Sequence, residues 1–287
     1  MLPESYLSPL HLPFNQSCLE GLLEFLPHDR DPGGEGFWIL MRAGDLAIVD
    51  QADALTLPAG NLPAGIDGSE ALYFGQWQGR PCRVVSIGEQ VELPAGFEMR
   101  ALTSPKPEIS IELLSLGGLA RQILYWHENS RYCGRCGAEQ SWLPGEWGKA
   151  CSACGTHHFP HIHPCVIVVV RRPGEILMTR KSAWPEGRYS LVAGFLDMGE
   201  CLEEAVVREV KEETGIDIEN VCYIGSQSWP FPSQLMTGFV ADYVGGEIVV
   251  EEKELEDARW FPVDDLPNLP PKRSISRYLI DNYKVLS

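Results

Sequence analysis

The sequence lacks any stretch of eighteen successive apolar residues, and its start, Met1-Leu-Pro-Glu-Ser-Tyr6, has no basic segment followed by an apolar run. The first absence argues against a membrane-spanning helix and the second against a secretory leader. Low-complexity segments and short-period repeats are also absent, so the composition gives no sign of a disordered chain. We therefore expect a folded, cytoplasmic protein with no membrane partner, and its 287 residues are enough for two domains.

Basic residues are scarce, because 23 lysines and arginines stand against 40 aspartates and glutamates, for a formal net charge of −17. Proteins that bind nucleic acid by bulk attraction need a basic surface that displaces counterions. We therefore expect no bulk nucleic-acid binding. The negative charge of a polyanionic substrate would have to be neutralised at the binding site itself, by bound metal ions and a few arginines.

The nine cysteines are an odd number, and four of them form two close pairs. Cys133 and Cys136 are followed, after fourteen residues, by Cys151 and Cys154, and a glycine follows each pair. This spacing predicts a zinc ribbon with a closed, structural, four-thiolate site rather than a redox dithiol or a disulfide framework. Four nearby histidines offer a replacement for one thiolate: His157, His158, His161 and His163.

A carboxylate-rich helix is predicted between Gly194 and Gly215. At helical spacing Glu209 and Glu213 fall on the same side as the apolar residues, so they point inward. Together with Glu212 they form a cluster that repels itself unless a hard divalent cation with oxygen ligands binds there. The pattern therefore predicts a magnesium or manganese site.

The residues around this helix would shape the metal site. Arg208 is spaced to pair with Glu204 or with Glu212, which would orient the ligands. Gly215 can end the helix in a left-handed turn. Gly194 allows close approach of the backbone, so the carbonyl of Ala193 becomes a further candidate ligand.

The order of predicted elements indicates an α/β protein. The boundaries we predict are an N-terminal domain over 1–128, a zinc ribbon over 129–160 and a catalytic domain over 161–287. The N-terminal domain would contain strands at 37–41, 46–49, 71–74 and 83–87 and a helix at 108–127. The catalytic domain would contain strands at 165–170, 176–179, 221–227, 235–243, 247–250 and 258–262, with a last helix at 274–283, in an α/β/α sandwich.

Two motifs carry a resemblance to a known family. Residues 194–216 match the Nudix box at every specified position. Residues 226–236, Ser-Gln-Ser-Trp-Pro-Phe-Pro-Ser-Gln-Leu-Met, closely resemble the SQPWPFPxS array of the NADH pyrophosphatase (NudC-type) branch of that family. Ser228 stands where the array has proline, and Ser233-Gln234 stands where the array has a variable residue followed by serine. The domain order is also similar to that branch, whose N-terminal domain is Nudix-like.

The resemblance implies hydrolysis of the pyrophosphate of NADH or NAD⁺ to nicotinamide mononucleotide and AMP, and release of the same cap from the 5′ end of RNA. It implies two or three Mg²⁺ or Mn²⁺ ions, one structural Zn²⁺ and a homodimer. The implied catalytic metal ligands are the carbonyl of Ala193 with Glu209, Glu213 and Glu254, with Glu212 in or near the shell and Glu213 as general base. The implied substrate contacts are Phe195, Gln227, Ser228, Trp229, Pro230, Phe231, Pro232, Ser233, Gln234, Glu146, Phe159 and Ser276.

Two other interpretations share parts of these patterns. A Nudix pyrophosphatase for ADP-ribose or a dinucleoside polyphosphate would share the box but not the 226–236 array. A zinc-ribbon regulator whose Nudix domain only senses NAD would not need to keep the intact cluster of Glu209, Glu212 and Glu213. Product analysis with NADH and Mg²⁺ separates the three.

Overall fold

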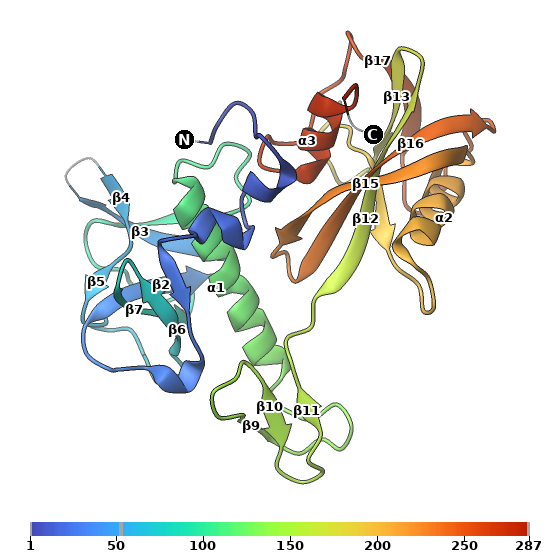
Figure 1. Ribbon diagram of the computed structural model, residues 1–287. Helices are drawn as coiled ribbons and strands as arrows, with labels where there is room; N and C mark the ends of the chain where they lie inside the picture. Colours follow the sequence, from blue (N-terminus) through green and yellow to red (C-terminus); the bar gives the residue numbers. More distant parts are fainter. Residues whose placement is uncertain (1, 52–53, 286–287) are drawn as a thin grey trace. The chain divides into compact units, whose positions relative to one another are not determined.

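The computed structural model describes residues 2–51 and 54–285, and Met1 and Ser287, the ends of the outer predicted domains, lie outside the described residues. The chain forms two compact units (Figure 1). The first unit contains Gln16–Ile162 and Pro230–Ser233, and the second contains Leu2–Asn15, His163–Trp229 and the chain from Gln234 onward. Because these units interleave along the sequence, the linear boundaries at 128 and 160 stay a prediction. No helix in the described part of the chain is long and apolar enough to cross a membrane.

The first unit is built on an eight-stranded sheet with one long helix. The sheet follows the order β1-β6-β7-β2-β3-β4, with β5 paired to β2 and β8 paired to β3. Its strands are β1 (Leu23–Phe25), β2 (Gly36–Arg42), β3 (Asp45–Gln51), β4 (Ala54–Thr56), β5 (Ala59–Gly60), β6 (Leu72–Trp77), β7 (Arg80–Ser86) and β8 (Phe97–Ala101). Helix α1 spans Ile111–Asn129 and starts three residues later than predicted, because the Ser110 side chain caps it by accepting from the Leu113 N–H. Short 3₁₀ turns lie at Gln16–Leu19 and His28–Arg30.

A small three-stranded sheet follows α1 in the same unit. It pairs β9 (Gln140–Trp142), β10 (Lys149–Cys151) and β11 (His157–His158). The buried Lys149 ammonium donates to the carbonyls of His127 and Ser130 at the end of α1, and it lies 5.2 and 5.1 Å from the ring centres of Trp126 and Trp142. These contacts attach the small sheet to the helix.

The second unit places one sheet between two helices. The strand order is β15-β16-β12-β13-β17, with β14 paired to β12. The strands are β12 (His163–Arg172), β13 (Glu175–Arg180), β14 (Val192–Phe195), β15 (Asp217–Trp229), β16 (Gln234–Gly245) and β17 (Asp257–Pro262). Helices α2 (Leu202–Thr214) and α3 (Ile275–Asn282) lie on opposite faces of the sheet (Figure 1).

The two faces of β12 explain this arrangement. Ile167 and Val169 pack into one core cluster with Leu279 of α3, whereas Val168 and Val170 pack into the other cluster with residues of α2. Because successive strand residues point to opposite faces, an unbroken apolar strand requires a cover on both sides. The predicted α/β/α sandwich is therefore observed.

One predicted strand is wrong. Residues 247–250 form no strand; instead, the backbone N–H groups of Val249 and Glu251 donate to the carbonyls of Thr214 and Glu213, at 2.9 and 3.1 Å. The last carbonyls of a helix have no partner within the helix, so this segment satisfies the end of α2 rather than extending the sheet. The composition of residues 247–250 favours a strand, but it does not indicate that their backbone will bind the end of α2.

Candidate active site

Helix α2 holds the predicted carboxylate cluster. Its start is closed by Glu204, whose side chain accepts from the Cys201 N–H at 2.8 Å, and its end by Gly215, which adopts the left-handed conformation at φ 73°. Glu209 and Glu213 are only 8% and 2% exposed, as their inward position on the helix predicted. Glu212 lies on the exposed side of the same turn.

Glu213 is a buried carboxylate whose two oxygens have no hydrogen-bond partner within the described residues. The nearest cation is Lys181, whose Nζ lies 3.9 Å from Oε1 of Glu213. Burial raises the pKa of Glu213 to about 7. Burying an ionised carboxylate without a partner costs free energy. The site therefore fits a bound cation that coordinates the two carboxylate oxygens of Glu213.

Arg208 organises the other carboxylates. It pairs with Glu200 at 2.6 Å, with Glu209 at 2.9 Å and with Glu212 at 3.0 Å. It also donates to the carbonyl of Phe195, at 2.9 Å. Of the two predicted partners, Glu212 is therefore observed, while Glu204 serves the helix cap instead.

Gly194 lies directly against the Glu209 carboxylate. A side chain at position 194 would overlap that carboxylate and displace it, so glycine leaves Glu209 in place beside strand β14. Burial raises the pKa of Glu209 against the opposing effect of Arg208. This packing brings Ala193 and the glutamates to the same wall.

An open cavity of about 910 Å³ lies beside these residues. Eight of the predicted site residues line it: Ala193, Phe195, Glu209, Glu212, Glu213, Trp229, Gln234 and Glu254. Among the described residues, no three carboxylate oxygens gather within 4.8 Å of one another as the cysteine sulfurs do, so the acidic groups line a wide cavity. Such a cavity suits metal ions shared with a substrate rather than an ion enclosed by protein alone.

The cavity residues that were not predicted from the sequence include Lys181, Trp184 and Lys253. Lys181 Nζ lies 3.9 Å from the Glu254 carboxylate as well as from Glu213. Both Lys181 and Trp184 follow strand β13 in an irregular segment, where neither residue type is distinguishable from ordinary surface. Only their convergence on the cavity identifies them.

The remaining array residues are divided between the two units. Gln227 is fully buried and donates to the carbonyls of Pro13 and Arg273, while its Oε1 accepts from the Ile275 N–H. Ser228 lies next to it in β15 and outside the cavity lining. Pro230, Phe231, Pro232 and Ser233 group with the first unit, where Phe231 packs 5.1 Å from the Arg121 guanidinium.

Three further predicted contacts lie outside the cavity lining. Ser276 is buried, and its hydroxyl lies 2.9 Å from that of Ser190, which does line the cavity. Glu146 and Phe159 are exposed residues of the first unit, in the β9–β10 loop and just after β11. A substrate role for these three residues stays a prediction.

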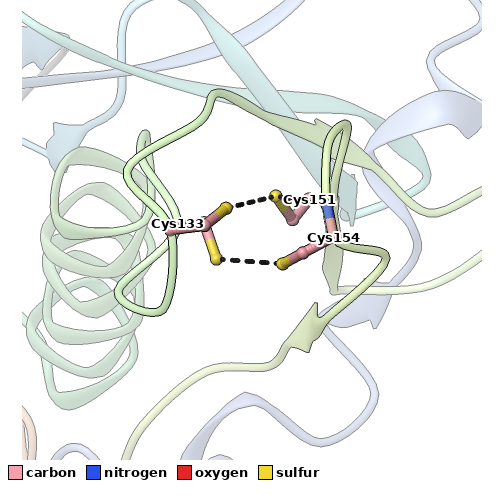
Figure 2. A group of neighbouring side chains, drawn as sticks. Cys133, Cys151 and Cys154 are labelled. Atoms are coloured by element: carbon pink, nitrogen blue, oxygen red, sulfur yellow. Dashed lines mark hydrogen bonds between the residues drawn. The ribbon is translucent and has the colours of Figure 1, made fainter.

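The four predicted zinc ligands form a second cluster. Cys133, Cys151 and Cys154 point toward one another in Figure 2, and all four Sγ atoms, with Cys136, lie within 4.8 Å of one another. Cys133 and Cys154 are separated by 3.7 Å, and Cys136 and Cys151 by 3.4 Å. Tetrahedral zinc with Zn–S bonds of about 2.3 Å requires sulfur separations of about 3.8 Å, so the cluster fits a structural Zn²⁺ with no histidine ligand.

Comparisons with known proteins agree with this geometry. Residues 35–126 match the NADH pyrophosphatase-like rudimentary NUDIX domain, residues 128–159 the NADH pyrophosphatase zinc ribbon domain, and residues 161–283 the NUDIX domain. Relatives with the name "NAD-capped RNA hydrolase NudC" include one from Pseudomonas aeruginosa (strain LESB58), 45% identical over 209 residues, which are 73% of this chain and 75% of that protein. Another, from Escherichia coli O1:K1 / APEC, is 39% identical over 241 residues, which are 82% of this chain and 91% of that protein.

A solved NUDIX hydrolase from Nitrosomonas europaea is more distant. It is 22% identical, covers 54% of this chain and 90% of its own, and has a TM-score of 0.45. The sheet between two helices, the carboxylate helix and the matched domains define a Nudix hydrolase. Its zinc ribbon, its rudimentary N-terminal domain and its relatives show that the chain belongs to the NudC-type branch of the Nudix family.

Proposed function

We propose that the chain hydrolyses the pyrophosphate bond of NADH or NAD⁺ to AMP and nicotinamide mononucleotide, which is reduced when the substrate is NADH, and that it removes the nicotinamide mononucleotide cap from the 5′ end of NAD-capped RNA. The observation that carries the proposal is Glu213, a buried carboxylate without a hydrogen-bond partner in the described chain, at the wall of a cavity large enough for a dinucleotide. The names of the relatives and the 226–236 array support the choice of substrate.

Glu209, Glu213, Glu254 and the carbonyl of Ala193 would hold two or three Mg²⁺ or Mn²⁺ ions, with Glu212 at the edge of the cluster. When bound, such ions make water nucleophilic and neutralise the charge that develops on the pyrophosphate. Glu213 would accept the proton of the attacking water, because its carboxylate lines the cavity beside the proposed metal ions and has no hydrogen-bond partner within the described residues. Arg208 would hold Glu209 and the Phe195 loop in position through its 2.9 Å contacts to both.

Aromatic surfaces at the cavity would accept the bases of the dinucleotide. Phe195, at the end of β14, is 52% exposed, and Trp229 is at the end of β15; both line the cavity. Stacking on an exposed ring is tolerant of base identity, so either end of the dinucleotide can occupy such a surface. Gln227 to Gln234, Glu146, Phe159 and Ser276 complete the proposed contact set, and the proposed assembly is a homodimer.

The test is product analysis. Purified protein with NADH and Mg²⁺ is expected to release reduced nicotinamide mononucleotide and AMP in equal amounts, separated by ion-pair chromatography. ADP-ribose and a dinucleoside tetraphosphate serve as competing substrates. Cleavage of either of these in preference to NADH would replace the proposed substrate, and binding of NADH without any cleavage would favour a sensor. Light scattering coupled to size-exclusion chromatography tests the dimer, which is expected at twice 31.9 kDa.

A further inference from the structure

The first residues of the chain belong to the second unit, with the active-site cavity. We call Leu2–Asn15 the strap. Leu12 is fully buried in the core cluster that also contains Ile167 and Leu279. A side chain at Gly225 would overlap Pro9, which forms part of the 3₁₀ turn Pro9–His11. The strap is therefore packed into the catalytic unit along β15, and it was not expected there from the sequence.

Asn15 pairs with the outer edge of β15 as a neighbouring strand would. Its side-chain carbonyl accepts from the N–H of Ser228 at 2.8 Å, and its side-chain amide donates to the carbonyl of Ser226 at 3.3 Å. The same amide donates to the carbonyl of Pro9 at 2.9 Å. Because β15 is the last strand of its sheet, its outward N–H and C=O groups have no strand partner, and one amide side chain supplies both contacts.

The two residues before Asn15 contact the next positions of the strand. The carbonyl of Pro13 accepts from the buried Gln227 side chain at 2.8 Å. Phe14 is 6% exposed and meets Trp229 edge to face, with ring centres 5.7 Å apart. Its φ of 74° is rare for a bulky residue and costs roughly 1–3 kcal/mol, so the surrounding packing must hold it there. Ser226 to Trp229 are thus contacted one after another by the strap.

The partner of Asn15 lies at a departure from the family array, which has proline where this chain has Ser228. Proline is tolerated on an edge strand where the N–H would face outward, and the Ser228 N–H does face outward, to Asn15. A serine therefore adds an outward donor and loses the fixed φ of proline. Asn15 binds that donor and restrains the strand.

We propose that Asn15, with Phe14, is a positioning residue for the substrate pocket: it holds Ser228, and through it the Trp229 ring, in place for the dinucleotide. This proposal rests on the proposed function, because Trp229 lines the same cavity as the catalytic glutamates. Asn15 itself does not line that cavity. Its effect is expected on substrate binding rather than on the chemical step.

The experiment is a double-mutant cycle between Asn15→Leu and Ser228→Pro, with NADH as substrate. Asn15→Leu leaves the Ser228 N–H without its partner and is expected to raise KM about 5-fold, with kcat within about 2-fold. Ser228→Pro removes that donor, so Asn15→Leu is expected to raise KM less than about 2-fold in the proline background. Asn15→Asp keeps the acceptor for Ser228 and is expected to stay nearer to the wild-type KM.

Glu4→Gln is the matched control, because it removes an exposed ion pair between the strap and Lys272 and leaves β15 untouched. A wild-type KM for Asn15→Leu would overturn the proposal, and so would an equal rise of KM in both backgrounds. If Asn15→Leu does not fold, the same cycle is measured with Asn15→Ala, which also removes the acceptor for the Ser228 N–H. Failure of the wild-type protein to cleave NADH would instead refute the proposed function.

Discussion

At the scale of single residues, the proposed chemistry depends on the burial of Glu213. Glu213→Gln is expected to lower turnover of NADH at least about 100-fold, since it removes a charged ligand and a proton acceptor while keeping size. The melting temperature of the metal-free protein should stay the same or rise, because the substitution removes a buried charge. Steady-state kinetics and thermal melts measure the two effects. Wild-type turnover in this variant would refute the carboxylate assignment.

The pH dependence of stability follows from the same residue. The pKa of Glu213 is raised from 4.5 to about 7, so between these values the folded chain keeps a proton that the unfolded chain has released. By linkage, the free energy of unfolding of the metal-free protein falls as pH rises from about 4.5 to about 7. The melting temperature of Glu213→Gln relative to wild type should therefore increase over this window in the presence of a chelator. A difference that stays constant with pH would contradict the assignment.

Lys181 gives a second prediction at this scale. Its ammonium lies 3.9 Å from both Glu213 and Glu254, so it repels a cation that binds between them. Lys181→Met is expected to tighten Mn²⁺ binding about 3- to 10-fold, a modest effect because the ammonium is partly exposed to solvent. Titration calorimetry without substrate measures it. Lys211→Met is the control, since Lys211 pairs with Asp217 outside the cavity. Equal Mn²⁺ affinities of the wild type, Lys181→Met and Lys211→Met would show that Lys181 does not act on the metal.

At the scale of elements, the zinc ribbon and helix α2 respond differently to substitution. Cys136→Ser is expected to lower the melting temperature and the soluble yield before it changes turnover per folded molecule, because binding of structural Zn²⁺ contributes directly to folding free energy. Metal analysis of the wild-type protein should find one zinc per chain. Cys201→Ser is the control, because Cys201 precedes α2, outside the cluster, and serine is a good helix cap. Equal stability of the wild type with and without a strong chelator would contradict the ribbon assignment.

At the scale of the whole molecule, the net charge of −17 constrains how RNA is bound. A capped RNA presents the same dinucleotide as free NAD, so we expect cleavage directed by the cap, with only a modest loss of rate at higher salt. A single-stranded 5′ end should be preferred, because a paired first nucleotide cannot reach aromatic surfaces such as Phe195 and Trp229.

One RNA, prepared with an NAD cap or a 5′ triphosphate and with a free or paired 5′ end, tests this prediction. Release of nicotinamide mononucleotide is followed by chromatography. The unpaired capped form should react fastest, and the triphosphate form, followed by release of its 5′ phosphates, should remain uncleaved. Equal cleavage of paired and unpaired capped RNA would contradict the proposed pocket, as would no cleavage of either while NADH is hydrolysed.

The sequence alone determined the features whose physics is local. The carboxylates of α2 recur at the spacing of one helix, and the cysteines lie in two short knuckles, so neighbouring residues are enough to predict which side chains converge. The packing of alternate β12 residues into two core clusters follows in the same way from a strand period of two. The carboxylates of α2 are also part of the Nudix box, whose family resemblance the comparisons confirm.

Only the tertiary structure decided which distant segments complete the site. Residues 247–250 were predicted as a strand because their composition favours one, yet they bind the open carbonyls at the end of α2. Lys181 and Trp184 reach the cavity from a segment without periodicity, and the strap reaches β15 from more than two hundred residues away in sequence. The contacts of residues 247–250 and of the strap satisfy backbone groups that remain unpaired after local structure has formed. No local pattern predicts which segment will supply the partner.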